Sequence, residues 1–343
     1  MRKQGVSLGT SGNQQVKQKL NITFEVVVTL GQMEVSFGEH QLGVEQPETV
    51  GTYQNIEASN DPYAVFDSAT LEQSGFDWGA ALSAAVSSRL AYENPDKCRK
   101  TCLNRWLFSA FKFIESGSTQ CFVASNATLI LVAFRGTEQV VDWLTNLNVL
   151  STATRYGSVH RGFFDAFQSV RSMLENVIEP IAKGRKVVLT GHSLGGALAT
   201  IAGIEWEKKF PLQSIYTFGQ PHVGTRSFQA NYQPVLGERH YRFVNAYDVV
   251  PRVPPGYIHV GKLVRFDGNG EVSALLESTS GLDAEALTYN EFESLKDRLE
   301  DGESNSRSTA EGLLPNYFSD HKLDRYIEKI QTQLAQTPSE RKT

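Results

Sequence analysis

The sequence predicts an α/β fold with a mostly parallel central sheet and helices on both faces. Strand-like apolar runs alternate with segments of helical periodicity through the middle of the chain. The apolar run 186–190 leads through a Gly-x-Ser-x-Gly pentapeptide into a helix of small residues. The 343 residues, 40% hydrophobic and 21% charged, fit one large core better than two equal domains.

The pentapeptide, residues 191–195, predicts a sharp turn between a strand and a helix. Gly191 and Gly195 leave room where a Cβ would clash, so Ser193 is expected to be pushed forward out of the turn at the strand's carboxyl end. The backbone N–H of Leu194, at the start of the helix, is free to donate to an anion. Five-residue matches also arise by chance, but here the strand and the helix lie where a nucleophilic serine needs them.

The sequence predicts three parts of the chain: an N-terminal extension, a domain and a short C-terminal tail. Residues 1–70 are expected to form an N-terminal extension with a polar tail and strand-like patterns at 21–30 and 33–37, to which we assign no chemistry. A domain over 71–335 follows, and 336–343 is a C-terminal tail. The domain begins with a helix over 76–92 and strands over 120–124 and 129–134.

The strand 129–134 ends in Arg135-Gly136-Thr137, one strand and helix before the serine. Acyl transfer needs a second oxyanion donor from such a loop, and Thr137 offers both an N–H and a hydroxyl. By itself this tripeptide is more often a turn. Its position makes Thr137 the candidate donor.

The segment 138–150 carries apolar residues at helical spacing. These are Val140, Trp143, Leu144 and Leu147. One interpretation is a surface helix that faces the core. The other is a lid, whose apolar face covers the site in water and turns toward a lipid interface.

Beyond the serine, a carboxylate and then a histidine are expected. Asp248 follows a strand at 241–245, at the sheet edge where ligands gather. Taken in isolation, an Asx turn that opens a proline-rich loop is the more common explanation of such a residue. Of the seven histidines, six lie before the serine, before Asp248 or in the strand-like run 257–264. His321 remains, in an expected loop before an amphipathic helix that carries Leu323, Tyr326, Ile327 and Ile330.

Together these motifs resemble the class 3 lipase family over about residues 75–332. The matching segments, in the family's order, are residues 133–137, 142–147, 159–163, 191–196, 218–221, 245–251 and 319–321. The resemblance implies an α/β-hydrolase fold with a helical lid at 138–150. It also implies Ser193 as nucleophile, Asp248 and His321 as its partners, and Thr137 and Leu194 as oxyanion-hole residues.

The resemblance implies a triacylglycerol lipase that acts on acylglycerols at a lipid–water interface. A phospholipase A1, a monoacylglycerol lipase or a feruloyl-type esterase would use the same chemistry, and a non-catalytic lipid-binding protein is a more remote alternative. No cofactor or metal is expected, since Cys98 and Cys102 have no further ligand nearby. The net charge of -5 gives no basic surface for nucleic acid, and no apolar run reaches the ~20 residues of a transmembrane helix.

Two features depart from the secreted fungal members of the family, which have a leader and disulfides. The first residues do not form an apolar leader, and three cysteines make no disulfide framework. A cytoplasmic protein, or a secreted one supplied without its leader, is therefore expected. The second departure is an acidic insertion at about 267–312, in which Leu287, Phe292, Leu295 and Leu299 suggest a helix. It is interpreted as solvated decoration, with a wall of the acyl groove as the alternative.

Overall fold

The computed structural model describes residues 61–278, 286–304 and 317–337. The strands expected at 21–30 and 33–37 lie outside these residues. Packing begins before the boundary expected at residue 70, because Tyr63 is buried and Phe66 stacks on Trp106 with ring centroids 4.0 Å apart. No helix in the described ranges is long and apolar enough to cross a membrane.

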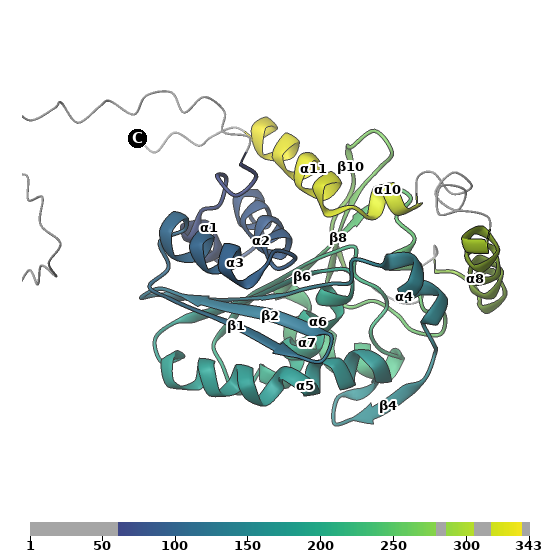
Figure 1. Cartoon of the computed structure of the whole chain (residues 1–343), viewed down its shortest axis with the longest axis horizontal. Helices are drawn as coiled ribbons and strands as arrows, with labels where there is room; N and C mark the ends of the chain where they lie inside the picture. Colours follow the sequence, from purple (N-terminus) through teal and green to yellow (C-terminus); the bar gives the residue numbers. More distant parts are fainter. Residues whose placement is uncertain (1–60, 279–285, 305–316, 338–343) are drawn as a thin grey trace, which may run out of the picture. The chain divides into compact units, whose positions relative to one another are not determined.

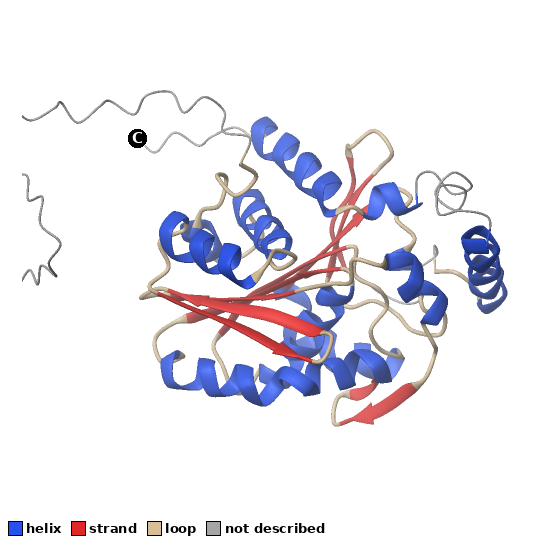
Figure 2. Ribbon diagram, viewed as in Figure 1, coloured by secondary structure: helices blue, strands red, loops and turns tan. Residues whose placement is uncertain are grey.

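A β-sheet, drawn in red in Figure 2, forms the centre of the domain. It has eight strands in the order β1-β2-β3-β6-β7-β8-β9-β10. The strands are β1 (Ala110–Ser116), β2 (Thr119–Ser125), β3 (Leu129–Phe134), β6 (Lys186–His192), β7 (Leu212–Phe218), β8 (His240–Asn245), β9 (Lys262–Phe266) and β10 (Val272–Ser278). Strands β3, β6, β7, β8 and β9 are parallel, and antiparallel strands complete both edges. The expected mostly parallel sheet is confirmed. A separate hairpin joins β4 (Ser151–Thr154) to β5 (Gly157–His160).

Helices cover both faces of this sheet, as Figure 1 shows. On one face lie α5 (Arg161–Ile178), α6 (Leu194–Trp206) and α7 (Arg226–Leu236), and on the other lie α2 (Trp78–Leu90) and α11 (Leu323–Gln336). The shorter or peripheral helices are α1 (Ser68–Leu71), α3 (Pro95–Lys100), α4 (Val140–Asn146), α8 (Tyr289–Ser304) and α10 (Tyr317–His321). Single turns of 3-10 or π helix occupy Thr101–Arg105, Glu179–Ile181, Gly237–Arg239 and Val250–Arg252.

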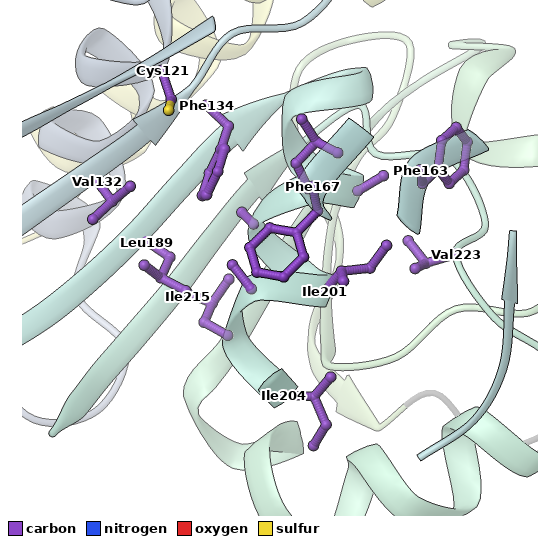
Figure 3. Close-up of a cluster of buried hydrophobic side chains, with 14 of the residues drawn as sticks. Cys121, Val132, Phe134, Phe163, Phe167, Leu189, Ile201, Ile204, Ile215 and Val223 are labelled. Atoms are coloured by element: carbon purple, nitrogen blue, oxygen red, sulfur yellow. The ribbon is translucent and has the colours of Figure 1, made fainter. Parts of the chain in front are cut away.

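Each face of the sheet has its own hydrophobic layer, because successive side chains of a strand point to opposite sides. Strand β3 is buried at all six positions: Ile130, Val132 and Phe134 join the layer under α5 and α6, and the intervening residues join the layer under α2. Figure 3 shows Phe167 and Ile201 of the first layer near these strand side chains. A strand buried on both faces reads as a continuous apolar run, as the sequence of β3 does.

The acidic insertion is folded where it is described. Its first part forms β10, which pairs with β9, and the predicted helix is α8. Phe292, Leu295 and Leu299 of α8 are buried and share a hydrophobic layer with Leu144 of α4. The interpretation as solvated decoration is therefore wrong for α8, because its apolar stripe is covered.

Candidate active site

The strained turn expected at the serine is present between β6 and α6. Ser193 has φ 57° and ψ -129°, a conformation that residues with a side chain rarely adopt. A Cβ at Gly191 would lie 2.2 Å from the carbonyl carbon of Gly195, and one at Gly195 would lie 2.2 Å from the carbonyl oxygen of Phe134. Both glycines are therefore needed for the strand, the helix and the neighbouring strand β3 to approach this closely.

Asp248 follows β8 and is buried, with both carboxylate oxygens hydrogen-bonded. Oδ1 accepts from the backbone N–H of Val250 at 2.9 Å, which closes the Asx turn considered as an alternative. Both oxygens also face Nδ1 of His321, at 3.0 and 2.9 Å, and Oδ2 accepts from the Tyr326 hydroxyl at 2.6 Å. The turn and the pairing with histidine are thus parts of one arrangement.

His321 is the last residue of the short helix α10, so its expected place in a loop is wrong. The helix that follows it is amphipathic as predicted: Leu323, Tyr326, Ile327 and Ile330 are all buried. Because the Asp248 carboxylate can only accept, Nδ1 of His321 carries the ring proton and Nε2 is the basic nitrogen. Nε2 of His321 and Oγ of Ser193 are buried, and neither has a hydrogen-bond partner among the described residues.

The residues after β7 connect the serine to this pair. The backbone N–H of Ser193 donates to the carbonyl of Phe218 at 2.9 Å. The next residue, Gly219, has φ +56°, and a Cβ there would lie 2.9 Å from both the His321 ring and Oδ2 of Asp248. The structure therefore brings together all three residues that the sequence singled out, around one glycine.

The loop after β3 lies against the serine on the other side. A Cβ at Gly136 would lie 3.2 Å from Cβ of Ser193 and 2.5 Å from the carbonyl oxygen of His192. Thr137 follows, and its Oγ1 accepts from the backbone N–H of Gln139 at 3.3 Å. Leu194 is the first residue of α6, so its N–H has no acceptor within the helix. Both expected oxyanion-hole residues are thus adjacent in sequence to groups that surround Ser193.

A cavity of about 590 Å³ lies beside His321. Its lining includes Thr137 and His321, four apolar side chains, and charged residues of α2, α4 and the start of α11. The apolar members are Val140, Val141, Phe318 and Leu323. Arg89 and Asp324, both lining residues, form an ion pair with a 2.8 Å contact. Within the described residues, no cluster of His, Cys, Asp and Glu could hold a metal ion.

Comparison with known proteins finds a family model that matches the middle of the chain. Residues 131–258 match the family model described as lipase (class 3). Over these residues the chain is similar to the class 3 lipase family.

The curated relatives match only part of the chain's length. A lipase from Rhizomucor miehei is 34% identical over 147 residues, 39% of this chain and 40% of the relative. A secreted mono- and diacylglycerol lipase from Fusarium solani is 36% identical over 149 residues, 40% of this chain and 44% of the relative. A solved structure of the Rhizomucor miehei triacylglyceride lipase is 23% identical with a TM-score of 0.47, covering 58% of this chain and 84% of that one. The chain thus spans less than half the length of these two curated relatives.

The expected lid segment, residues 138–150, contains the helix α4. Leu144 and Leu147 are buried, whereas Val140 and Trp143 are partly buried and pack on the same hydrophobic layer. Trp143 stacks on Phe163 of α5, with ring centroids 6.2 Å apart. The helix therefore faces the core and also forms part of the cavity wall, so the two interpretations are compatible. Its action as a lid stays a prediction.

Two residues of the site were missed by sequence reasoning. Tyr326 was placed in an apolar stripe, but its hydroxyl reaches Asp248; the signal was a polar tip in an otherwise aliphatic row. Gly219 was noted only as part of a motif. Its signal was its position directly after a strand, at the same sheet edge as the serine turn. Burial and the nearby Asp248 charge raise the pKa of Tyr326 well above its ordinary value, so the phenol remains a neutral donor.

Proposed function

We propose that this protein is a triacylglycerol lipase, a serine hydrolase that cleaves carboxylic esters of acylglycerols. The observation that carries the proposal is the grouping of Ser193, His321 and Asp248 around Gly219, with Ser193 on a strained turn. A serine is a weak nucleophile unless a nearby base accepts its proton, and a basic imidazole nitrogen held by a buried carboxylate meets that need. The roles that the family resemblance implied fit this geometry.

In the proposed mechanism, Nε2 of His321 removes the Ser193 proton while Oγ attacks the ester carbonyl. The resulting oxyanion accepts hydrogen bonds from the N–H groups of Thr137 and Leu194. Asp248 remains ionised, fixes the tautomer of His321 and stabilises the imidazolium. When the intermediate collapses, the bond between the carbonyl carbon and the alcohol oxygen breaks, and His321 protonates the leaving alcohol. Water then repeats the sequence on the acyl-enzyme and releases the acid.

The cavity supports a lipid ester as the substrate. Its volume of about 590 Å³ and its wall of Val140, Val141, Phe318 and Leu323 suit an acyl chain beside His321. We further propose that the protein acts at a lipid–water interface through the partly buried apolar face of α4. The catalytic domain is proposed to span 71–335, with residues 61–70 packed onto it.

The proposal is tested by hydrolysis of tributyrin and of a long-chain triglyceride emulsion across the solubility limit. Ser193→Ala is expected to lower the rate by several powers of ten in both assays. Ser88→Ala is the matched control, because Ser88 is also a fully buried serine but bonds to Thr190 in the core. A Ser193→Ala protein that keeps its activity, free of contaminating esterase, would overturn the proposal.

The same assays separate the alternatives. A jump in rate when the interface forms supports a lipase, whereas saturation on dissolved ester indicates an esterase of the feruloyl type or a monoacylglycerol lipase. Release of fatty acid from phosphatidylcholine vesicles at a higher rate would indicate a phospholipase A1. Failure to react with a fluorophosphonate would indicate a non-catalytic lipid-binding protein, because such a scaffold has no activated serine.

The Fusarium solani relative is described as secreted, which supports secretion of the present protein as well. A cytoplasmic location stays a prediction from the sequence. Immunodetection of the protein in culture medium and in washed cells of its source organism would decide between the two compartments.

A further inference from the structure

Two side chains in the cavity wall have no part in the mechanism above. Tyr92, just beyond the end of α2, and His192, the residue before the serine, both line the cavity. The Tyr92 hydroxyl lies 2.8 Å from Nδ1 of His192. Nε2 of His192 lies 2.7 Å from the backbone carbonyl oxygen of His321. We call these two residues the Tyr92–His192 pair.

The position of each proton in this chain of hydrogen bonds follows from the acceptors. A carbonyl oxygen can only accept, so Nε2 of His192 must carry the proton that it donates to His321. Nδ1 of His192 is then an acceptor, and the Tyr92 hydroxyl is its donor. The hydroxyl of Tyr92 also lies against the backbone of Gly136, since a Cβ built on Gly136 would come within 2.2 Å of it. The hydrogen bonds therefore run in one direction, from Tyr92 through His192 to the carbonyl of His321.

This chain connects three parts of the site that lie far apart in sequence. Gly136 precedes Thr137, the expected oxyanion donor, and a Cβ at Gly136 would come within 2.2 Å of the Tyr92 hydroxyl. His192 precedes Ser193. His321 is the last residue of α10. The last carbonyl groups of a helix receive no hydrogen bond from an N–H within the helix. The ring of His192 supplies such a donor to the carbonyl of His321.

Tyr92 makes a second contact with the loop 135–137, because the Arg135 guanidinium lies over the Tyr92 ring, 5.7 Å from the ring centroid. The rings of His192 and His321 also face each other, with centroids 4.5 Å apart and planes 34° apart. A neutral His192 suits this stack, since His321 becomes a cation during the reaction. Burial, and then the nearby His321, lower the pKa of His192 well below its ordinary value.

We propose that the Tyr92–His192 pair positions two parts of the site relative to Ser193. These are the loop 135–137, which carries the expected oxyanion donor, and the base His321. The proposal rests on the proposed function, because it assigns the pair a role in that reaction. The pair itself exchanges no proton with the substrate. Its effect is expected on kcat, through the geometry of the transition state, and not on KM.

The first experiment compares Tyr92→Phe with Tyr63→Phe on a soluble short-chain ester. Tyr63 is a matched control, because its hydroxyl donates a 2.8 Å hydrogen bond to Glu93 in the same part of the fold but away from the cavity. Loss of one such bond at Tyr92 is expected to lower kcat by about tenfold, with KM changed by less than about twofold. Tyr63→Phe is expected to leave both unchanged. Equal kcat values in the two variants, or a raised KM with unchanged kcat at Tyr92, would overturn the proposal.

A second comparison uses His192. His192→Gln keeps an amide N–H that can donate toward His321, whereas His192→Ala does not, so Gln is expected to retain several-fold more of the kcat. Adding Tyr92→Phe to His192→Ala is expected to cause little further loss, because the chain is already broken. Fully multiplicative losses would show that the two side chains act separately, which contradicts the proposal.

Nitrogen-15 NMR of the imidazole rings reads the protons without any need for activity. The proposal predicts a neutral His192 with its proton on Nε2 at neutral pH, and a changed His321 resonance in Tyr92→Phe. A proton on Nδ1 of His192 would overturn it. If the unmodified protein hydrolyses no ester, the proposed function fails, while the NMR result still decides whether the pair is arranged as described.

Discussion

The hydroxyl of Tyr326 donates a 2.6 Å hydrogen bond to Oδ2 of Asp248, the same oxygen that faces Nδ1 of His321 at 2.9 Å. The Tyr326 oxygen itself accepts from the backbone N–H of Asn245, the last residue of β8. The helix after His321 therefore supplies a group that fixes the carboxylate on which His321 depends.

Tyr326→Phe is expected to lower both stability and activity. The variant leaves a buried carboxylate oxygen one donor short, which we expect to cost about 1.5–3 kcal/mol in the free energy of unfolding. Activity is expected to fall by about tenfold through looser placement of the His321 ring. Urea unfolding and kcat on a soluble ester measure the two effects. In Tyr232→Phe, which removes a buried hydroxyl bonded to His240, stability alone should fall; a matching loss of kcat there would refute the link to Asp248.

Gly219→Ala is expected to lower kcat far more than an alanine placed at another glycine with a positive φ. At φ +56° an alanine is strained, and its Cβ would lie 2.9 Å from His321 and Asp248, forcing the pair apart. We expect a fall in kcat of about a hundredfold or more, as for loss of one element of transition-state stabilisation. Gly184→Ala is the matched control, because Gly184 has φ +77° with open space around it. It should lose about 1 kcal/mol of stability and no kcat; equal kcat losses in the two variants would contradict the role given to Gly219.

Trp143→Gln tests the lid. The variant removes the ring that stacks on Phe163 and makes the core-facing side of α4 more polar. If α4 turns toward a lipid surface, activity on an emulsion should fall more than hydrolysis of a short dissolved ester. Comparison of the two rates, with the emulsion area held constant, measures the difference. Equal losses in both assays would count against a lid and in favour of a helix that only stabilises the core.

His240 is expected to make the fold sensitive to acid. Burial, and then the Arg242 charge, lower the pKa of His240 from 6.5 to about 3. The unfolded chain therefore takes up a proton near pH 6.5 that the folded chain refuses until about pH 3, so stability is lost as the pH falls through this window. The loss is about 1.4 kcal/mol per pH unit for this one group. Urea unfolding of His240→Gln between about pH 7 and 4 should show a shallower slope, by about one proton. An unchanged slope would show that His240 is not the group responsible.

The sequence was sufficient for those parts of the fold that depend on local pattern. The β3 run is apolar at each position because it is buried on both faces, and its predicted range matches the structure. The serine turn was predictable because Gly191 and Gly195 are the residues that such a close approach demands. In contrast, β1 was not predicted: it is an edge strand whose positions are exposed or only partly buried, apart from the buried Ile114.

The sequence was sufficient to predict which residues form the candidate site, but not the contacts that hold them in place. Ser193, Asp248 and His321 each follow from a local signal and their order along the chain. The supporting contacts of Tyr92, Gly219 and Tyr326 depend on which helices and strands meet in three dimensions. No periodicity in the sequence reports that α2 and α11 cover the same face of the sheet, so these supporting roles needed the structure.

The position of α11 has a consequence for how the protein is made. The ribosome synthesises the strands that carry Ser193 and Asp248 well before α10 and α11. Because His321 and Tyr326 come last among these groups, the nascent chain can fold much of its sheet while the triad is still incomplete. On the proposed function, esterase activity is therefore expected only after α11 has left the exit tunnel and docked on the sheet.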